Sequence, residues 1–230
     1  MICFCFAMKK EADPLIEESE VCERKKSGFA EIVLCKKGKT RFAVLISGIG
    51  KGFACSGLTS TLLLYPIDSV VNAGVAGSLD GKCAPILSCV ISSDLVQHDM
   101  DTSAIGDPKG LISGINLTEL PADEGLQSSL AKAAEKAGVP FCFGRISSGD
   151  TFFSPNDSRK QDVVSFFRPL AIDMESACFA QVSYVFKIPY CALRVISDCE
   201  HPETEYAQNV GEASRRVKKI LLEFLKEAGQ

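Results

Sequence analysis

The sequence predicts a three-layer α/β fold in which helices cover both faces of a central mixed β-sheet. Short apolar runs alternate with longer helical segments along the chain, and one early pair of runs is joined by a tight turn. The 230 residues fit one large domain, and neither a linker nor an internal repeat interrupts them. We therefore expect a single domain over residues 1–230.

The expected strands are short apolar runs bounded by turn residues, at 2–7, 29–35, 41–47, 68–73, 86–96, 141–146, 170–173 and 190–196. Residues 36–39 form a hairpin turn in which Gly38 can adopt a positive φ. Residues 74–77 are expected to be a tight loop after the strand at 68–73. Ligands of such sheets bind beyond the carboxyl ends of the strands, so the segments at 8–11, 47–50, 74–77, 147–153, 173–175 and 197–198 are the candidate site.

The expected helices cover residues 10–19, 53–65, 123–137, 155–167, 175–186 and 204–228. Asp123 is a suitable N-cap, and Pro66 ends the second helix. Pro14 is compatible with the first helix only within its first turn. Residues 98–121 show no periodicity, and so long an irregular stretch is usually functional or mobile.

Composition excludes several classes of function. The net charge of −4 argues against a general binder of nucleic acid or anionic membranes. The apolar opening at 2–8 is interrupted by Lys9, Lys10 and Glu11, so it is too short to span a membrane and lacks the charge order of a signal peptide. No CxxC pair occurs among the eleven cysteines, and seven of them lie among apolar neighbours, which indicates buried, reduced thiols: Cys3, Cys5, Cys35, Cys55, Cys142, Cys178 and Cys191. We expect a cytoplasmic protein with a small-molecule partner.

Two motifs are weak indications of cofactor or metal binding. Residues 48–52 are glycine-rich, but Phe53 replaces the third glycine of a dinucleotide loop, and Gly52 follows Lys51 where a P-loop has Ser or Thr. Residues 98–101 (HDMD) would bind a metal only if further ligands converged on them. We expect neither a metal nor a cofactor.

Three carboxylates stand out because each follows an apolar strand: Glu11, Glu175 and Asp198. Any one of them alone is explained by its favourable position near a helix N-terminus. Three at the same end of one sheet favour a catalytic site. Cleavage of a glycosidic bond uses one carboxyl group to protonate the leaving group and another to activate water or stabilise the sugar cation.

From Ile2 to the last helix, the chain resembles the 5′-methylthioadenosine/S-adenosylhomocysteine nucleosidases of the nucleoside phosphorylase-like superfamily. The matching segments are AMKKE at 7–11, SGIGK at 47–51, NAGVAG at 72–77, HDMD at 98–101, SGDTF at 148–152, DMESA at 173–177 and LRVISD at 193–198. The resemblance implies hydrolysis of both named nucleosides to adenine and a thioribose, without metal or cofactor, by a homodimer.

The resemblance also implies roles for individual residues. Asp198 matches the acid that protonates N7 of adenine, and Glu11 the base that positions water. Glu175 and Met174 match the ribose binders, with Glu175 at the 2′ and 3′ hydroxyls. The other expected substrate-binding residues are Phe152 stacked on the purine, the Phe153 backbone at its edge, Met8, Ile49 and Tyr206 along the ribose and thioalkyl side, Val75, Ala76 and Gly77, and Arg194 and Ser197 in support of the acid.

Some positions depart from the family pattern. Val75 stands where members carry Ser or Thr, Ile105 replaces an aromatic residue, and residues 106–118 differ from the loop that caps the partner subunit's 5′ pocket. Three alternatives therefore stay open. The first is a phosphorylase, which Asn72 and Val75 disfavour because related phosphorylases place Arg and Ser at these positions. The second is a nucleosidase for another 5′-substituted adenosine or for a futalosine-type nucleoside. The third is a non-enzymatic nucleoside-binding protein.

The catalytic assignment carries an electrostatic expectation for Asp198. An acid near neutral pH needs a pKa above the ordinary value of ~3.9. Desolvation and the Glu11 carboxylate are expected to raise the pKa of Asp198, and Ser197 and Arg194 to oppose that rise.

Overall fold

The computed structural model describes residues 1–228. Its strands are β1 (Ile2–Phe6), β2 (Glu20–Ser27), β3 (Ala30–Lys37), β4 (Thr40–Ile46), β5 (Ser69–Ser78), β6 (Cys89–Gln97), β7 (Glu119–Pro121), β8 (Phe141–Ser148), β9 (Ala171–Asp173) and β10 (Tyr190–Asp198). Its helices are α1 (Lys9–Glu17), α2 (Lys51–Leu64), the 3₁₀ turn η1 (Ser103–Ile105), α3 (Glu124–Lys136), α4 (Ser158–Phe167), α5 (Ser176–Phe186) and α6 (Pro202–Ala228). The mixed α/β class is as predicted.

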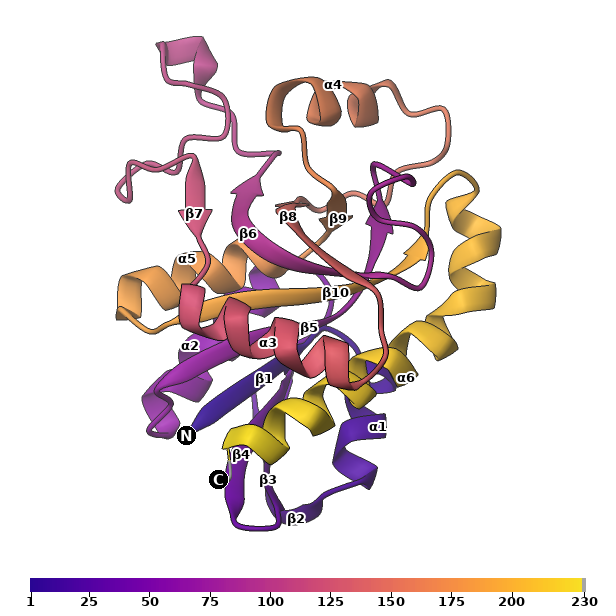
Figure 1. Cartoon of the computed structure of the whole chain (residues 1–230). Helices are drawn as coiled ribbons and strands as arrows, with labels where there is room; N and C mark the ends of the chain where they lie inside the picture. The colour runs from indigo at the N-terminus through magenta and orange to yellow at the C-terminus, as the bar shows by residue number, and fades with distance from the viewer. Residues whose placement is uncertain (229–230) are drawn as a thin grey trace.

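The ten strands form one mixed sheet in the order β10-β6-β8-β9-β5-β1-β4-β3-β2, with β7 beside β6. β1 lies parallel between β4 and β5. β10 pairs antiparallel with β6 and also parallel with β5, so Leu193 faces both Ile91 and Ala73. The five strands β10, β6, β8, β9 and β5 therefore form a closed ring. The sheet continues from β5 as an open part made of β1, β4, β3 and β2 (Figure 1).

Helices cover both faces of the sheet (Figure 1). One core cluster contains Leu15 of α1, Leu130 of α3 and Leu221 of α6. A second cluster contains Leu58 of α2 and Phe179 of α5. All five side chains are fully buried, and burying a side chain of this size stabilises the fold by roughly 1.5–3 kcal/mol. The three predicted layers are therefore present.

Several local signals in the sequence are confirmed. β3 and β4 form the predicted hairpin, and Gly38 in its turn has a φ of 60°. The Asp123 side chain accepts a hydrogen bond from the Leu126 amide (2.9 Å) and caps α3. α2 ends at Leu64, two residues before Pro66.

Other boundaries differ from prediction. Residues 74–77 are not a loop, because β5 continues through them to Ser78. Small residues are needed there since a Cβ on Gly74 would lie 2.4 Å from Arg194 Nη1 and 2.7 Å from Glu11 Oε1. Pro14 lies in the second turn of α1, so the expectation of a first-turn proline is wrong; the helix ends soon after, at Glu17. The strand β2 was not predicted.

The irregular segment at 98–121 contains only η1 and the short strand β7. In Figure 1 its magenta to pink trace stands out from the body of the molecule at the upper left. The eleven cysteines, all within residues 1–228, are free thiols, and of the seven expected to be buried, Cys55 and Cys142 are only half-buried. Within the described chain, no helix has both the length and the apolar composition needed to cross a lipid bilayer.

Candidate active site

A cavity of about 450 Å³ opens where all six candidate segments of the sequence meet. β1, β4, β5 and β10 run in the same direction, so their carboxyl ends share one edge of the sheet, and β8 and β9 end beside them. The cavity is lined by Ala7, Met8, Glu11, Ile49, Val75, Ala76, Gly77, Phe152, Ile172, Asp173, Met174, Glu175, Ser197, Asp198, Glu203 and Tyr206. The three singled-out carboxylates therefore face one space.

Asp198 ends β10 at one side of the cavity and is almost fully buried. Burial and, to a smaller extent, the Glu205 charge raise the pKa of this carboxyl group. The Ser197 hydroxyl, which donates a 2.6 Å hydrogen bond to Oδ1, and the Lys160 charge oppose the rise. The direction of the pKa shift is as expected, but Glu205 and Lys160 act in place of Glu11 and Arg194. A Cβ on Gly77 would lie 2.9 Å from Asp198 Oδ2, so the close approach requires glycine.

Glu11 enters the cavity from the first turn of α1. Its Oε1 accepts a hydrogen bond from the Val75 amide (2.9 Å), and its Oε2 accepts one from the Met8 amide (3.0 Å). Burial raises the pKa of Glu11, although the Arg194 charge and both amides oppose the rise. A carboxylate whose pKa moves toward neutrality is a stronger general base.

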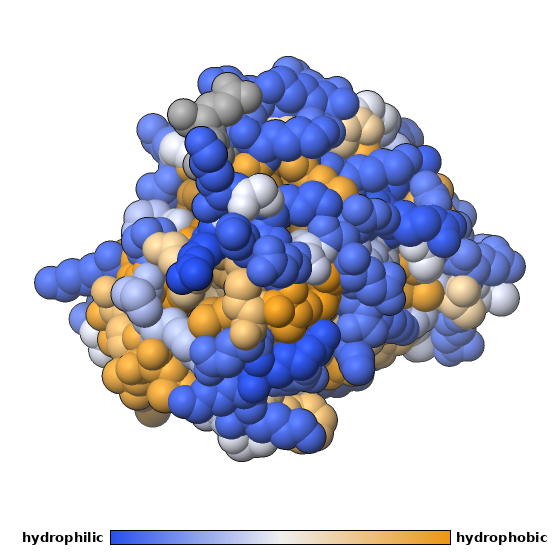
Figure 2. Space-filling view, turned by 90° about the horizontal axis from the view of Figure 1, so that it is seen from below, coloured by the Kyte–Doolittle hydropathy of each residue, from blue (hydrophilic) through white to orange (hydrophobic). Residues whose placement is uncertain are grey.

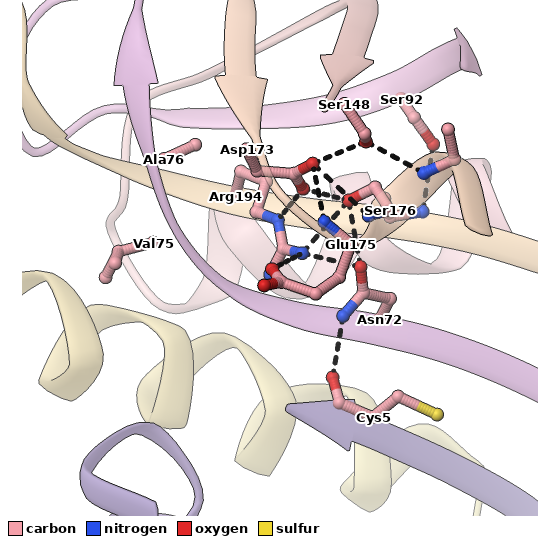
Figure 3. A network of polar contacts seen from close by, with 12 residues as sticks. Cys5, Asn72, Val75, Ala76, Ser92, Ser148, Asp173, Glu175, Ser176 and Arg194 are labelled. Atoms are coloured by element: carbon pink, nitrogen blue, oxygen red, sulfur yellow. Dashed lines mark hydrogen bonds and ion pairs between the residues drawn. The ribbon is translucent and has the colours of Figure 1, made fainter. Parts of the chain in front are cut away.

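A buried polar network lies beneath the Glu175 side of the cavity (Figure 3). Arg194 Nε donates to Asp173 Oδ2 (2.7 Å), and its Nη2 donates to Asn72 Oδ1 (2.6 Å) and Ser176 Oγ (3.0 Å). The same Nη2 lies 4.0 Å from Glu175 Oε2. Arg194 was expected to support the acid Asp198. Its strongest partner is instead Asp173, and its charge lies beside Glu175.

Glu175 contacts a backbone amide in addition to the Arg194 side chain. Its Oε1 accepts a hydrogen bond from the Gly50 amide (2.8 Å). Burial and the neighbouring Asp173 charge raise the pKa of Glu175 to about 8, although the Arg194 charge and the Gly50 amide favour the ionised form. This carboxyl group therefore keeps its proton to a higher pH than an exposed glutamate does.

The outer end of the cavity is aromatic and exposed. The Phe152 and Tyr206 rings meet edge to face with centroids 6.0 Å apart. The Tyr206 hydroxyl accepts a hydrogen bond from Lys10 Nζ (2.7 Å) and donates a weak one to Met8 Sδ (3.6 Å). Lys10 and Glu203 place charges of both signs at this mouth.

Comparison with known proteins matches residues 1–226 to the Phosphorylase superfamily. A 5′-methylthioadenosine/S-adenosylhomocysteine nucleosidase of Glaesserella parasuis is 35% identical over 204 residues, which cover 86% of this chain and 88% of that protein. The chain belongs to this nucleosidase family. It is an N-glycosyl hydrolase. A Staphylococcus carnosus protein of the same name is 29% identical, and the match covers 98% of this chain and 99% of that protein.

Solved structures agree with the fold of the nucleosidase. The Helicobacter pylori 5′-methylthioadenosine/S-adenosylhomocysteine nucleosidase, in complex with a pyrrolidine inhibitor, superimposes with a TM-score of 0.91 at 30% identity, covering 98% of this chain and 97% of that one. A futalosine hydrolase of Helicobacter pylori gives the same TM-score, identity and coverage.

Two of the expected site residues of this chain lie outside the main cavity. Arg194 lies under its floor. Phe153 lines a recess of about 50 Å³ that shares Phe152, Gly77 and Asp198 with the cavity, and its ring packs 5.8 Å from that of His98. The other twelve expected residues line the cavity itself.

Sequence reasoning missed four residues that line the cavity: Ala7, Ile172, Asp173 and Glu203. Asp173 had a signal, because it is a carboxylate at a strand end two residues before Glu175. Glu203 had none, since an acidic residue in the first turn of a helix is common. Within residues 1–228, no three His, Cys, Asp or Glu side chains gather as metal ligands. His98 instead shares a 2.8 Å hydrogen bond with Ser147 Oγ.

Proposed function

We propose that the protein hydrolyses the N-glycosidic bonds of 5′-methylthioadenosine and S-adenosylhomocysteine, releasing adenine and the 5-thioribose product. The observation that carries this proposal is that Glu11, Glu175 and Asp198 line one cavity whose volume suits a nucleoside. The names of the Glaesserella parasuis and Staphylococcus carnosus relatives support the same pair of substrates.

In the proposed reaction, Asp198 donates its proton to N7 of adenine while the bond between N9 and C1′ breaks. Water adds to C1′, and Glu11 orients this water and takes its proton. The raised pKa of Asp198 supports its role as the acid, and general acid catalysis contributes of order 10²–10⁴-fold. A Helicobacter pylori nucleosidase with an Asp-to-Asn change was solved with 5′-methylthioadenosine in its active site, at 29% identity and a TM-score of 0.91.

Substrate binding is proposed to follow the length of the cavity. Glu175 and Met174 hold the ribose hydroxyls, and Phe152 stacks on the purine, whose edge meets the Phe153 backbone in the small recess beside Asp198. The thioalkyl group extends to the mouth. The mouth and the adjoining wall are formed by Met8, Ile49, Val75, Ala76, Gly77, Ser197 and Tyr206.

One assay tests the proposed function. The purified protein is incubated with 5′-methylthioadenosine, S-adenosylhomocysteine, futalosine and inosine, with and without phosphate, and the free base is measured. We expect adenine from the first two nucleosides without phosphate. Release that requires phosphate would establish a phosphorylase, and binding without any release would establish a nucleoside-binding protein.

A futalosine-type nucleoside is the second candidate substrate, because the Helicobacter pylori futalosine hydrolase matches this chain as well as the nucleosidase does. Faster cleavage of futalosine than of the two adenosine derivatives would favour it. Phosphorolysis has less support. Val75 lines the cavity and offers no polar group to a phosphate ion. Asn72 lies buried beneath the cavity, where it is hydrogen-bonded to the Cys5 carbonyl and to Arg194, so its identity does not discriminate between hydrolysis and phosphorolysis.

We also propose a homodimer in the cytoplasm, where the free thiols stay reduced. Apolar side chains are exposed along α2 and α5, namely Phe53, Leu63, Leu64, Tyr184, Val185 and Phe186. Figure 2 shows hydrophobic residues gathered at its lower left, on the side where α2 lies in Figure 1. Ile105, in the 3₁₀ turn η1, is 81% exposed. Sedimentation at micromolar concentration should show a dimer, and a fully active monomer would contradict this.

A further inference from the structure

Two motifs that the reaction leaves without a role come together in the structure. Lys51 ends the glycine-rich segment after β4, and Asp99 belongs to the HDMD segment after β6. Asp150, from the loop after β8, joins them. We propose that Lys51, Asp99 and Asp150 form a positioning cluster that sets the spacing between the ribose and purine ends of the site, an inference that rests on the proposed function.

Asp99 joins all three segments through its carboxylate. Oδ2 accepts hydrogen bonds from Lys51 Nζ (2.5 Å) and from the Asp150 amide (3.0 Å). Oδ1 accepts one from the Gln97 side chain (3.0 Å), whose own oxygen accepts from Gln181 of α5 (2.6 Å). The carboxylate is therefore fixed from both sides, and it ties the two loops to the core of the molecule.

Asp150 closes the ring of contacts. Its Oδ1 accepts a hydrogen bond from the Lys51 amide at the start of α2 (2.9 Å), and its Oδ2 lies 3.8 Å from Lys51 Nζ. A Cβ on Gly50 would lie only 3.1 Å from Asp150 Oδ1, and Gly50 has a φ of 94°. The loop before α2 therefore lies directly against the loop after β8.

Each loop leads from the cluster to a different part of the substrate. Gly50, directly before Lys51, donates its amide hydrogen to Glu175 on the ribose side. Asp150 is two residues before Phe152 on the purine side. None of the three cluster residues lines the cavity, so any effect on the reaction passes through Glu175 and Phe152.

The charges decide which residue of the cluster matters most. Lys51 is the one cation between two carboxylates, and its side chain is only 22% exposed. Burial alone would raise the pKa of Asp99, but the Lys51 ammonium and the Asp150 amide outweigh it and lower that pKa. Without Lys51, two ionised groups would repel each other across the loops, whereas Asp99→Asn removes a charge and keeps one acceptor. We therefore expect Lys51→Met to be the more damaging change.

The test compares Lys51→Met, Lys51→Arg, Asp99→Asn and the double variant Lys51→Met with Asp99→Asn. Lys136→Met is the matched control, because Lys136 pairs with Glu227 on the surface far from the site. Each variant is assayed for kcat/KM with the nucleoside that the unmodified protein hydrolyses, for adenine affinity and for Tm. If the unmodified protein hydrolyses none, the affinity for 5′-methylthioadenosine replaces kcat/KM.

We expect Lys51→Met to lower kcat/KM about tenfold, while adenine, which contacts only the purine end, binds within about twofold of its original affinity. Lys51→Arg should recover part of the loss, and the double variant should lose no more than Lys51→Met alone, because the residues act as one unit. Equal losses for nucleoside and adenine, additive losses in the double variant, or unchanged kcat/KM in all variants would each overturn the proposal. The proposed function would survive any of these results, because it rests on the products of the unmodified protein.

Discussion

The inner end of the cavity and its mouth are built in different ways. Inside, Glu11, Glu175 and Asp198 are at most 6% exposed, and each is held by hydrogen bonds from the chain itself. Toward solvent, the side chain of Ile49 at the mouth is 52% exposed, and that of Phe152 is 54% exposed. One chain therefore completes the environment of the three carboxylates but leaves the outer end of the cavity, where we propose that the 5′ group of the substrate lies, with few fixed contacts.

The comparison predicts its largest effect at Arg194, because this residue holds the inner end together. Arg194→Met should lower the free energy of unfolding by about 3–5 kcal/mol, since it leaves Asp173 and Glu175 buried without their cation. Urea unfolding measures this. Arg194→Lys should recover only part of the loss, because an ammonium cannot reproduce the planar fork of bonds. A stable Arg194→Met variant would mean that the network is not what orders the inner end.

Asp198→Asn is the next largest change, because it keeps the shape of the inner end and removes only the proton. We expect turnover to fall at least ~100-fold while a substrate analogue still binds. The variant should cleave a nitrophenyl riboside, whose leaving group needs no proton, nearly as well as the unmodified protein does. Equal losses for both substrates would show that Asp198 has a structural role.

Glu175→Gln should lower kcat about tenfold with a smaller change in KM, because the ionised Glu175 of the substrate complex binds the ribose hydroxyls more strongly as the sugar becomes cationic. Steady-state kinetics with 5′-methylthioadenosine measure both constants. An unchanged kcat would remove Glu175 from the catalytic groups.

The raised pKa of Glu175 also predicts how stability depends on pH. Unfolded chain loses this proton near the ordinary value of ~4.3, whereas the folded protein keeps it up to about pH 8. Folded protein therefore binds more protons across that window, and the free energy of unfolding should fall as the pH rises from about 5 to 8. Urea titrations at pH 5 and 8 should show a smaller fall for Glu175→Gln. Identical pH dependence in both proteins would contradict the assignment.

The smallest effect is expected at the mouth. S-Adenosylhomocysteine ends in an ammonium and a carboxylate, whereas 5′-methylthioadenosine ends in a neutral methyl group. The double variant Lys10→Met with Glu203→Gln should lower the kcat/KM ratio of the first to the second by only about twofold to fivefold, because exposed ion pairs are weak. The effect should disappear in high salt. A change of more than tenfold would show that the mouth is more ordered than its exposure indicates.

The same contrast explains what could be predicted from sequence. Glu11, Glu175 and Asp198 were found because each ends an apolar run, which is a local pattern. The partners of Arg194 were assigned wrongly, since which buried charge meets which depends on how β10 lies against β5. The edge strand β2 was missed because its residues, EVCERKKS, are nearly all exposed and only pairing with β3 makes them a strand. The closure of the sheet likewise depends on pairings between distant segments.

The double pairing of β10 has a consequence for motion. All nine of its residues are buried, β5 pairs with it along its length, and β6 secures its other edge at residues 193–195. Segments of this kind exchange their amide hydrogens only in the rarest openings of a protein, whereas exposed loops exchange readily. Asp198 and Arg194 therefore lie on one of the slowest-exchanging elements, while Ile49 and Phe152 lie on fast ones. Substrate can enter and leave through fluctuations of the loops while Asp198, the proposed proton donor, stays in register with the rest of the sheet.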